Sequence, residues 1–308
     1  MAVRRTEQLH RKAEGLDLQP DSAILAVLAE GQIEAAQSVH GAVDAIAEAA
    51  ALCARALSGG GRLVYAAAGS SGLMALADAL ELPGTYGIAR DKIVVLLAGG
   101  TASLQDLAGG PEDDAAQAVK DLAMAGVAAG DCLIALSASG STPYAVGAVE
   151  EARRRGLSTI GIANNPDTPL GSAADVGIVL ATPPEVIAGS TRMGAGTAQK
   201  IALNMLSTLV AVHLGHVHDG HMVNLRADNI KLKGRAVRIV AAITGVEEDF
   251  AARALDQAGG AVKPAILIAA GAAGVRHAQE LLDQGGGRVR AALMALEDEG
   301  TRPLKHGT

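Results

Sequence analysis

The sequence predicts an α/β protein built on a doubly wound parallel sheet with a small helical appendage at the C-terminal end. Five short runs are nearly continuous in apolar residues, as expected of strands covered on both faces. They span residues 62–68, 92–98, 131–137, 158–163 and 175–181. Helical patterns separate most of these runs, and this alternation favours parallel strand pairing. After about residue 196 the pattern is helical throughout.

The helices are expected in the following order. Pro20-Asp21-Ser22 is a start signal for a long helical region that runs to about Leu57, where Ser58-Gly59-Gly60-Gly61 ends it. Further helical patterns cover 71–81, 112–128, 143–155, 196–215 and 223–244, and three or four short ones lie between Gly245 and about Leu296. The expected domains are an N-terminal helical segment (1–58), a central α/β domain (59–244) and a small helical domain (245–308).

The amino-acid composition limits which classes of partner the protein can bind. With 308 residues, 49% of them apolar, the chain can bury one large core and a smaller unit. A formal net charge of −7 leaves no basic face for nucleic acid. No run is long enough to span a membrane and no secretory signal is visible, so we expect a cytoplasmic protein. Cys53 and Cys132 each lie in an apolar segment and are interpreted as buried small hydrophobic residues.

Three turns are crowded with hydroxyl groups and glycines: AGSSG at 68–72, SASGSTPY at 137–144 and AGSTRMGAGTAQK at 188–200. The first two follow a predicted strand directly, at the carboxyl end where doubly wound sheets bind ligands. Backbone N–H groups at helix N-termini hold phosphate well, and glycine lets the backbone approach closely. The turns therefore predict a site for a small anionic ligand such as a sugar phosphate. Simple helix capping stays open for each turn taken singly. The G-x-G-x-x-G spacing of a dinucleotide site is absent.

Several segments carry a resemblance to a known family: GGGRLVYAAAGSSG, ELPGTYG, SASGSTPY, GSTRMGAGTAQKIALNMLST and LDQGGGRVR. They resemble the N-acetylmuramic acid 6-phosphate etherases, which carry a sugar isomerase (SIS) domain, and more distantly the glucokinase regulatory proteins. The resemblance covers nearly the whole chain. It implies an SIS fold, a homodimer and cleavage of the D-lactyl ether of a 6-phosphosugar, with no metal or organic cofactor.

That reaction needs a base and an acid, and the family uses two glutamates. Glu81 of ELPGTYG matches the first, which implies a proton donor to the departing lactate oxygen. Its apolar neighbours Leu80 and Leu82 are expected to raise the pKa of the carboxyl group. An ungapped comparison puts the second glutamate at Gly109, so Glu112 is the candidate substitute. Acidic residues are also common in the first turn of a helix, which is the alternative interpretation of Glu112.

The same matching predicts the residues that line the sugar phosphate site: Ser70, Ser71, Ser137, Ser139, Thr142, Ser190, Thr191, Asn229 and Lys231. The chain departs from the family at Leu73 and Ser141, where etherases carry arginine, and at Gly194 and Ile230, where they carry lysine and glutamate. Losing these charges changes how a phosphate or carboxylate is bound.

These residues are compatible with three functions. The whole-chain resemblance favours an etherase-like lyase, and the alternatives are a non-catalytic phosphosugar-binding regulator and a phosphosugar isomerase. Four histidines lie close together in the sequence, at His213, His216, His218 and His221. Imidazoles at short spacing are common metal ligands. Because the family has no metal there, we do not expect a metal site.

Overall fold

The computed structural model describes residues 4–107, 109–225 and 230–300. By its internal contacts the chain forms two compact units. The first comprises Met1–Leu80 and Arg90–Val210, and the second comprises Glu81–Ala89 and Ala211–Thr308. The three-part division expected from the sequence stays a prediction.

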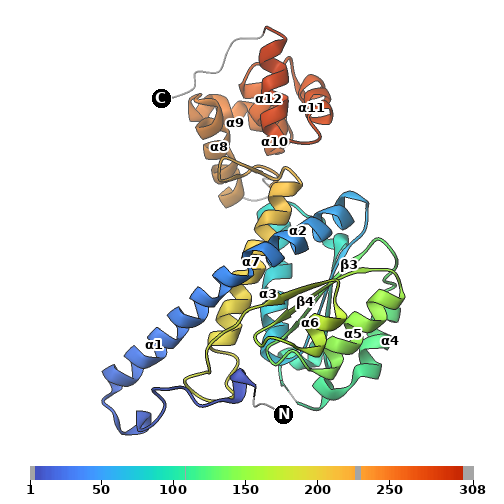
Figure 1. Ribbon diagram of the computed structural model, residues 1–308. Coiled ribbons are helices and arrows are strands. Elements are labelled where there is room, and N and C mark those ends of the chain that lie inside the picture. Colours follow the sequence, from blue (N-terminus) through green and yellow to red (C-terminus); the bar gives the residue numbers. More distant parts are fainter. Residues whose placement is uncertain (1–3, 108, 226–229, 301–308) are drawn as a thin grey trace. The chain divides into compact units, whose positions relative to one another are not determined.

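The first unit is built on a parallel sheet of five strands in the order β2-β1-β3-β4-β5 (Figure 1). The strands are β1 (Leu63–Ala67), β2 (Ile93–Leu97), β3 (Cys132–Ser137), β4 (Ser158–Ala163) and β5 (Val176–Val179). Every residue of β1 and β3 is buried, as expected of strands covered on both faces. The edge strand β5 instead alternates buried and exposed residues. The predicted doubly wound parallel sheet is confirmed.

One face of the sheet is covered by three helices, α4 (Ala115–Met124), α5 (Pro143–Arg154) and α6 (Pro169–Ala173). The other face carries α2 (Val43–Ser58), α3 (Gly69–Tyr86) and α7 (Gly194–His213).

Buried polar groups join this second face together. On β1, the Tyr65 hydroxyl donates to Asp78 of α3 at 2.9 Å, and Ser207 of α7 donates to the other oxygen of Asp78, also at 2.9 Å. Cys53 of α2 and Cys132 of β3 are both fully buried free thiols, as predicted. Their sulfur atoms lie 3.8 Å apart, a contact that the sequence does not indicate.

Several helix boundaries differ from those predicted. The long N-terminal helical region is divided into α1 (Asp21–Gln37), η3 (Ser38–Ala42) and α2, because the Ser38 hydroxyl donates to the Ala35 carbonyl and competes with the backbone ladder. The helix predicted over 112–128 begins only at Ala115, after the 3₁₀ turn η6 (Gly110–Asp113). Asp114 caps α4 by accepting a hydrogen bond from the Gln117 N–H at 2.8 Å.

The second unit is mainly helical. A hairpin of β6 (Val217–His218) and β7 (His221–Met222) precedes five helices: α8 (Ile230–Thr244), α9 (Glu248–Gln257), α10 (Val262–Ala269), α11 (Val275–Gln284) and α12 (Val289–Asp298). The four short helices after Gly245 confirm the predicted helical appendage. Residues 223–225 lie in a turn rather than in the helix predicted there. In the described parts of the chain, no helix combines the length and apolar character needed to cross a membrane.

Candidate functional site

Two of the three predicted loops start side by side at the carboxyl edge of the sheet. Strand β1 pairs with β3, and Ala67 lies opposite Leu136, so the chain leaves both strands at the same level. The strand order places the topological switch point between β1 and β3, where doubly wound sheets bind ligands. Ala68 with the first turn of α3, which begins at Gly69 and not at residue 71 as predicted, and the loop 137–142 therefore form the framework of the candidate site.

The second loop is a ring of hydroxyl groups. The buried Ser137 hydroxyl oxygen lies 2.8 Å from that of Thr142 and 3.3 Å from that of Ser139. Ser139 in turn lies 3.2 Å from the Ser141 hydroxyl oxygen. Within the described structure Thr142 makes no side-chain hydrogen bond to the first turn of α5, although it occupies the N-cap position. Helix capping therefore does not explain this threonine, and its hydroxyl faces the ring instead.

Gly140 makes this tight loop possible. Its φ is +71°, a conformation that residues with a side chain rarely adopt. A Cβ atom placed there would lie only 2.4 Å from Cβ of Thr168, in the loop before α6. The glycine at this position is therefore required both by the backbone and by the space around it.

The first loop carries an acidic neighbour. Gly69 has a φ of +52° and begins α3, followed by the half-buried Ser70 and the buried Ser71. A Cβ atom placed on Gly69 would lie 2.7 Å from Oε1 of Glu112, so this carboxyl group packs directly on the loop backbone. Burial of Glu112 raises the pKa of its carboxyl group, and the negative charge of Asp113 raises it further. Glu112 thus lies against the first loop and is half-buried, and it also stands in the first turn of η6, as the alternative interpretation expects.

The site is also bordered by the N-terminal segment, which the sequence analysis does not connect with it. The Arg5 N–H donates to Oδ1 of Asn165 at 2.9 Å, and the Asn165 amide donates to the Ala138 carbonyl at 3.0 Å. Thr6 is buried and bonded to the same amide at 3.3 Å, while its carbonyl accepts from the Gly189 N–H at 3.1 Å. Asn165 thereby links the N-terminal segment to the second loop.

The chain is similar to known proteins along most of its length. The SIS domain model matches residues 113–209, and the glucokinase regulatory protein N-terminal SIS domain model matches residues 45–153. The N-acetylmuramic acid 6-phosphate etherase of Deinococcus radiodurans is 42% identical over 298 residues, which cover 97% of this chain and 98% of that protein. The chain belongs to the N-acetylmuramic acid 6-phosphate etherase family. The Symbiobacterium thermophilum etherase is 45% identical over 269 residues, covering 87% and 89% of the two chains. Among solved structures, a phosphoheptose isomerase from Francisella tularensis aligns with a TM-score of 0.49 and 20% identity, over 63% of this chain and 100% of that one.

Position 109 is where the sequence comparison predicts that the second family glutamate is missing. Gly109 has a φ of −71°, which any residue can adopt. A Cβ atom there would meet no atom within 4 Å. A Cβ atom could therefore be added at this position without displacing its neighbours.

Glu81, the first catalytic residue that the family resemblance implies, lies inside α3 and not at its end, because the helix continues to Tyr86. Its side chain is exposed, and it belongs to the second unit. The prediction that apolar neighbours enclose Glu81 is wrong for Leu80, which is 62% exposed. The other neighbour, Leu82, is buried. Lys231 is exposed on α8, also in the second unit, and Asn229 lies outside the described residues.

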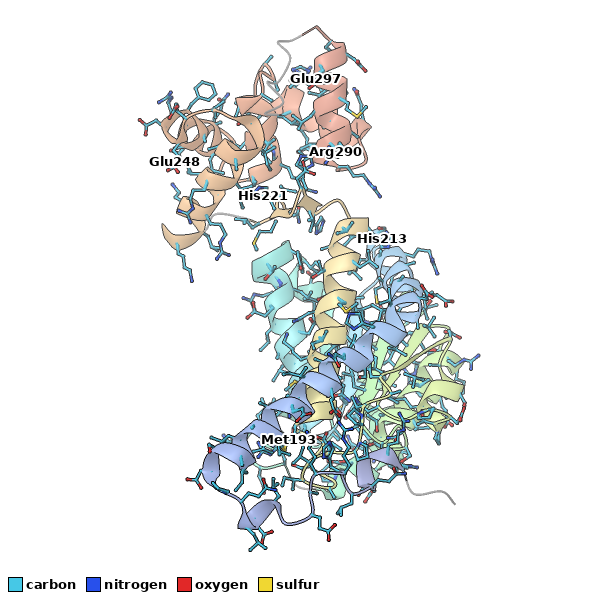
Figure 2. All side chains as sticks on the ribbon, turned by 60° about the vertical axis from the view of Figure 1, so that its left-hand side comes forward. Met193, His213, His221, Glu248, Arg290 and Glu297 are labelled. Atoms are coloured by element: carbon cyan, nitrogen blue, oxygen red, sulfur yellow. The ribbon has the colours of Figure 1, made fainter. Side chains whose placement is uncertain are left out.

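The third loop differs from a phosphate cradle in one respect. At the start of α7, the N–H groups of Gly194 and Ala195 donate to the two carboxylate oxygens of the buried Glu185, at 2.9 and 2.8 Å. A carboxylate thus already neutralises these N-terminal donors. The partly exposed Ser190 and Thr191 precede this turn, near Met193 (Figure 2), and their predicted contact with the sugar phosphate stays a prediction.

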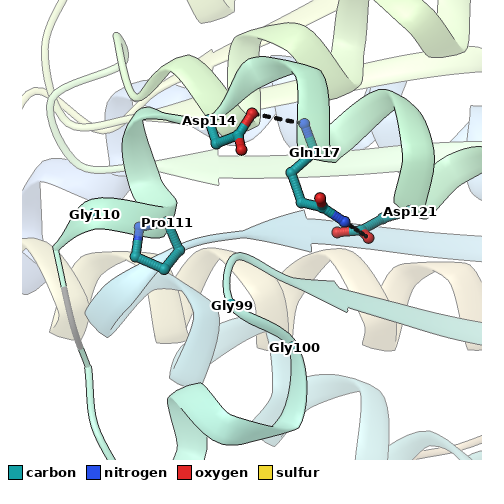
Figure 3. A pocket seen from close by; sticks show the side chains of 7 residues that line it. All are labelled: Gly99, Gly100, Gly110, Pro111, Asp114, Gln117 and Asp121. Carbon is teal, nitrogen blue, oxygen red and sulfur yellow. Dashed lines mark hydrogen bonds between the residues drawn. The ribbon is translucent and has the colours of Figure 1, made fainter.

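A cavity of about 570 Å³ lies beside the turn that carries Glu112 (Figure 3). It is lined by Gly99, Gly100, Gly110, Pro111, Asp114, Gln117 and Asp121. Its carboxylates have protein partners: Asp114 caps α4, and Asp121 accepts from the Gln117 amide at 2.7 Å and from the Tyr144 hydroxyl at 2.6 Å. The three polar side chains that line this cavity are therefore already hydrogen-bonded to the protein.

The four histidines lie in the second unit. His213 is exposed at the end of α7, and His218 pairs with His221 in the β6–β7 hairpin (Figure 2). Burial lowers the pKa of His216 to about 4, so its imidazole is neutral at neutral pH. Among the described residues, no group of three or more histidine, cysteine, aspartate or glutamate side chains is placed to hold a metal ion.

Proposed function

We propose that this protein cleaves the D-lactyl ether of N-acetylmuramic acid 6-phosphate. The observation that carries the proposal is the Glu112 carboxyl group, packed on Gly69 where the first hydroxyl-rich loop begins α3, with its pKa raised by burial. The second hydroxyl-rich loop leaves the adjacent strand. A phosphorylated sugar bound at this sheet edge would lie beside a carboxyl group that can take part in proton transfer.

In the open-chain sugar, the aldehyde at C1 acidifies the proton on C2. Glu112 in its carboxylate form removes that proton, the C3–O bond breaks, and the lactyl oxygen leaves with a proton donated by Glu81. Water then adds at C3, which yields N-acetylglucosamine 6-phosphate and D-lactate. The phosphate is held by hydroxyl groups, and no cofactor takes part.

The hydroxyl groups proposed to line the phosphate and sugar are those of Ser70, Ser71, Ser137, Ser139, Thr142, Ser190 and Thr191. Asn229 and Lys231 are proposed to approach from the helical region. We also propose that the protein is a cytoplasmic homodimer. Exposed apolar side chains on α1 support a partner surface, since Leu25 is 64% and Ile33 is 58% exposed. Sedimentation of the purified protein tests the dimer.

The activity is tested by incubating the purified protein with N-acetylmuramic acid 6-phosphate and following D-lactate with a coupled dehydrogenase. We expect D-lactate from the wild type and a large loss in Glu81→Gln, with binding of the phosphosugar retained in both. Binding without any D-lactate would reject the lyase. That result would favour the regulatory alternative, which the glycine at position 109 supports, unless the phosphosugar is isomerised.

A further inference from the structure

Arg4 touches the hydroxyl ring of the second loop. Its guanidinium Nη1 donates a hydrogen bond to the Ser141 hydroxyl, and Ser141 is itself 3.2 Å from Ser139. The Arg4 side chain is exposed, so it packs against no core that would account for its position. The interaction joins residues far apart in the sequence and brings a positive charge to the loop.

The backbone next to Arg4 is held at several points. Asn165 accepts from the Arg5 N–H at 2.9 Å. Thr6 is only 1% exposed, and its carbonyl accepts from the Gly189 N–H at 3.1 Å. Because Asn165 also donates to the Ala138 carbonyl, the same side chain anchors both the N-terminal segment and the hydroxyl-rich loop. Arg4 is thus presented to the ring by a backbone that is fixed on the loop itself.

Arg4 brings a positive charge to the second hydroxyl-rich loop, which has none of its own. Neither 68–72 nor 137–144 contains a lysine or an arginine. The third loop contains two cations: Arg192 is exposed, and Lys200 donates to the Asn204 side chain at 2.8 Å. A phosphate dianion bound only by hydroxyl groups and N–H groups lacks a counter-charge, whereas charge-assisted hydrogen bonds from arginine are markedly stronger.

We propose that Arg4 binds the phosphoryl group of the sugar phosphate at the Ser137–Thr142 loop, and that it supplies from the N-terminal segment the cation that the family resemblance implies at position 141. The inference rests on the proposed function for the identity of the ligand. A guanidinium carries more donors than the single bond to Ser141 uses, and its planar fork matches two phosphate oxygens. Arg4 would therefore select phosphorylated sugars over unphosphorylated ones.

The test is calorimetric titration of the full-length protein with N-acetylglucosamine 6-phosphate, which is not consumed without lactate. Arg4→Gln should weaken binding about ten-fold or more, the loss expected of a charge-assisted contact. The matched control is Arg11→Gln, which removes an equal charge from an exposed ion pair with Glu34 and should bind like the wild type. Adding Ser141→Arg to Arg4→Gln should restore most of the affinity.

Three results would overturn the inference: wild-type affinity in Arg4→Gln, an equal loss in Arg11→Gln, or no recovery in the double variant. An unchanged melting temperature in Arg4→Gln shows that the fold is intact, as expected for an exposed side chain. The proposed activity and the proposed role of Arg4 can be contradicted independently of each other. Wild-type protein that binds the phosphosugar and needs Arg4, but releases no D-lactate, contradicts only the activity. Protein that releases D-lactate and is indifferent to Arg4 contradicts only the inference.

Discussion

Replacing Glu112 by glutamine is the sharpest test of the candidate site, because it should lower the activity without lowering the stability. If Glu112 removes the C2 proton, its loss should lower kcat by about 100-fold or more, the usual contribution of a positioned general base. D-lactate release at saturating N-acetylmuramic acid 6-phosphate measures this. KM should change little, since the proposed phosphate contacts are made by the loops and not by the carboxyl group.

The effect on stability follows from the pKa. Burial raises the pKa of Glu112 in the folded protein, so the folded state binds a proton more tightly than the unfolded state does. Stability is then lost as pH rises from the unfolded pKa through the folded pKa, and at neutral pH the charged carboxylate is a net cost. Glutamine is neutral at every pH and removes that cost. Urea unfolding should therefore show a free energy of unfolding for Glu112→Gln that is equal to or above the wild-type value.

Two further variants sharpen the result. Asp113 is exposed, and its charge contributes to the raised pKa of Glu112. Asp113→Asn should therefore keep the rate and move the acidic limb of the pH–rate profile to lower pH. Because position 109 is open, Gly109→Glu in the Glu112→Gln background should recover part of the activity. Wild-type turnover in Glu112→Gln would refute the assignment of the base.

Two other predictions concern the framework of the site. Asp78→Ala should lower the free energy of unfolding by about 2–4 kcal/mol, because two buried hydroxyl groups lose their acceptor. Asp78→Asn should lose less, and equal losses in urea titrations of the two variants would contradict the hydrogen-bonding argument. Gly140→Ala should cost about 1–3 kcal/mol, from its positive φ and the overlap with Thr168, and should also weaken phosphosugar binding. Gly109→Ala is the control and should leave stability unchanged within about 0.5 kcal/mol.

The sheet and the placement of its loops follow from the sequence. Continuous apolar runs over 62–68 and 131–137 mark strands buried on both faces, and the helical patterns between them require parallel connections. Since parallel strands end at the same edge, serine-rich turns directly after two such runs had to share that edge. These features depend on neighbouring residues, so local composition and periodicity are enough to predict them.

The contacts that define the site were decided by the tertiary structure. Nothing local to Glu112 indicates that its carboxyl group lies on Gly69, and nothing near Gly194 indicates that Glu185 caps α7. The exposure of Leu80 also contradicts the apolar enclosure expected from its residue type. The Glu112–Gly69 contact joins segments far apart in the chain, whereas the Glu185–Gly194 bond spans nine residues. Both depend on how helices and loops pack on the finished sheet. The sequence by itself therefore determined the sheet and the edge at which a ligand would bind, whereas only folding decided which charged side chains reach that edge.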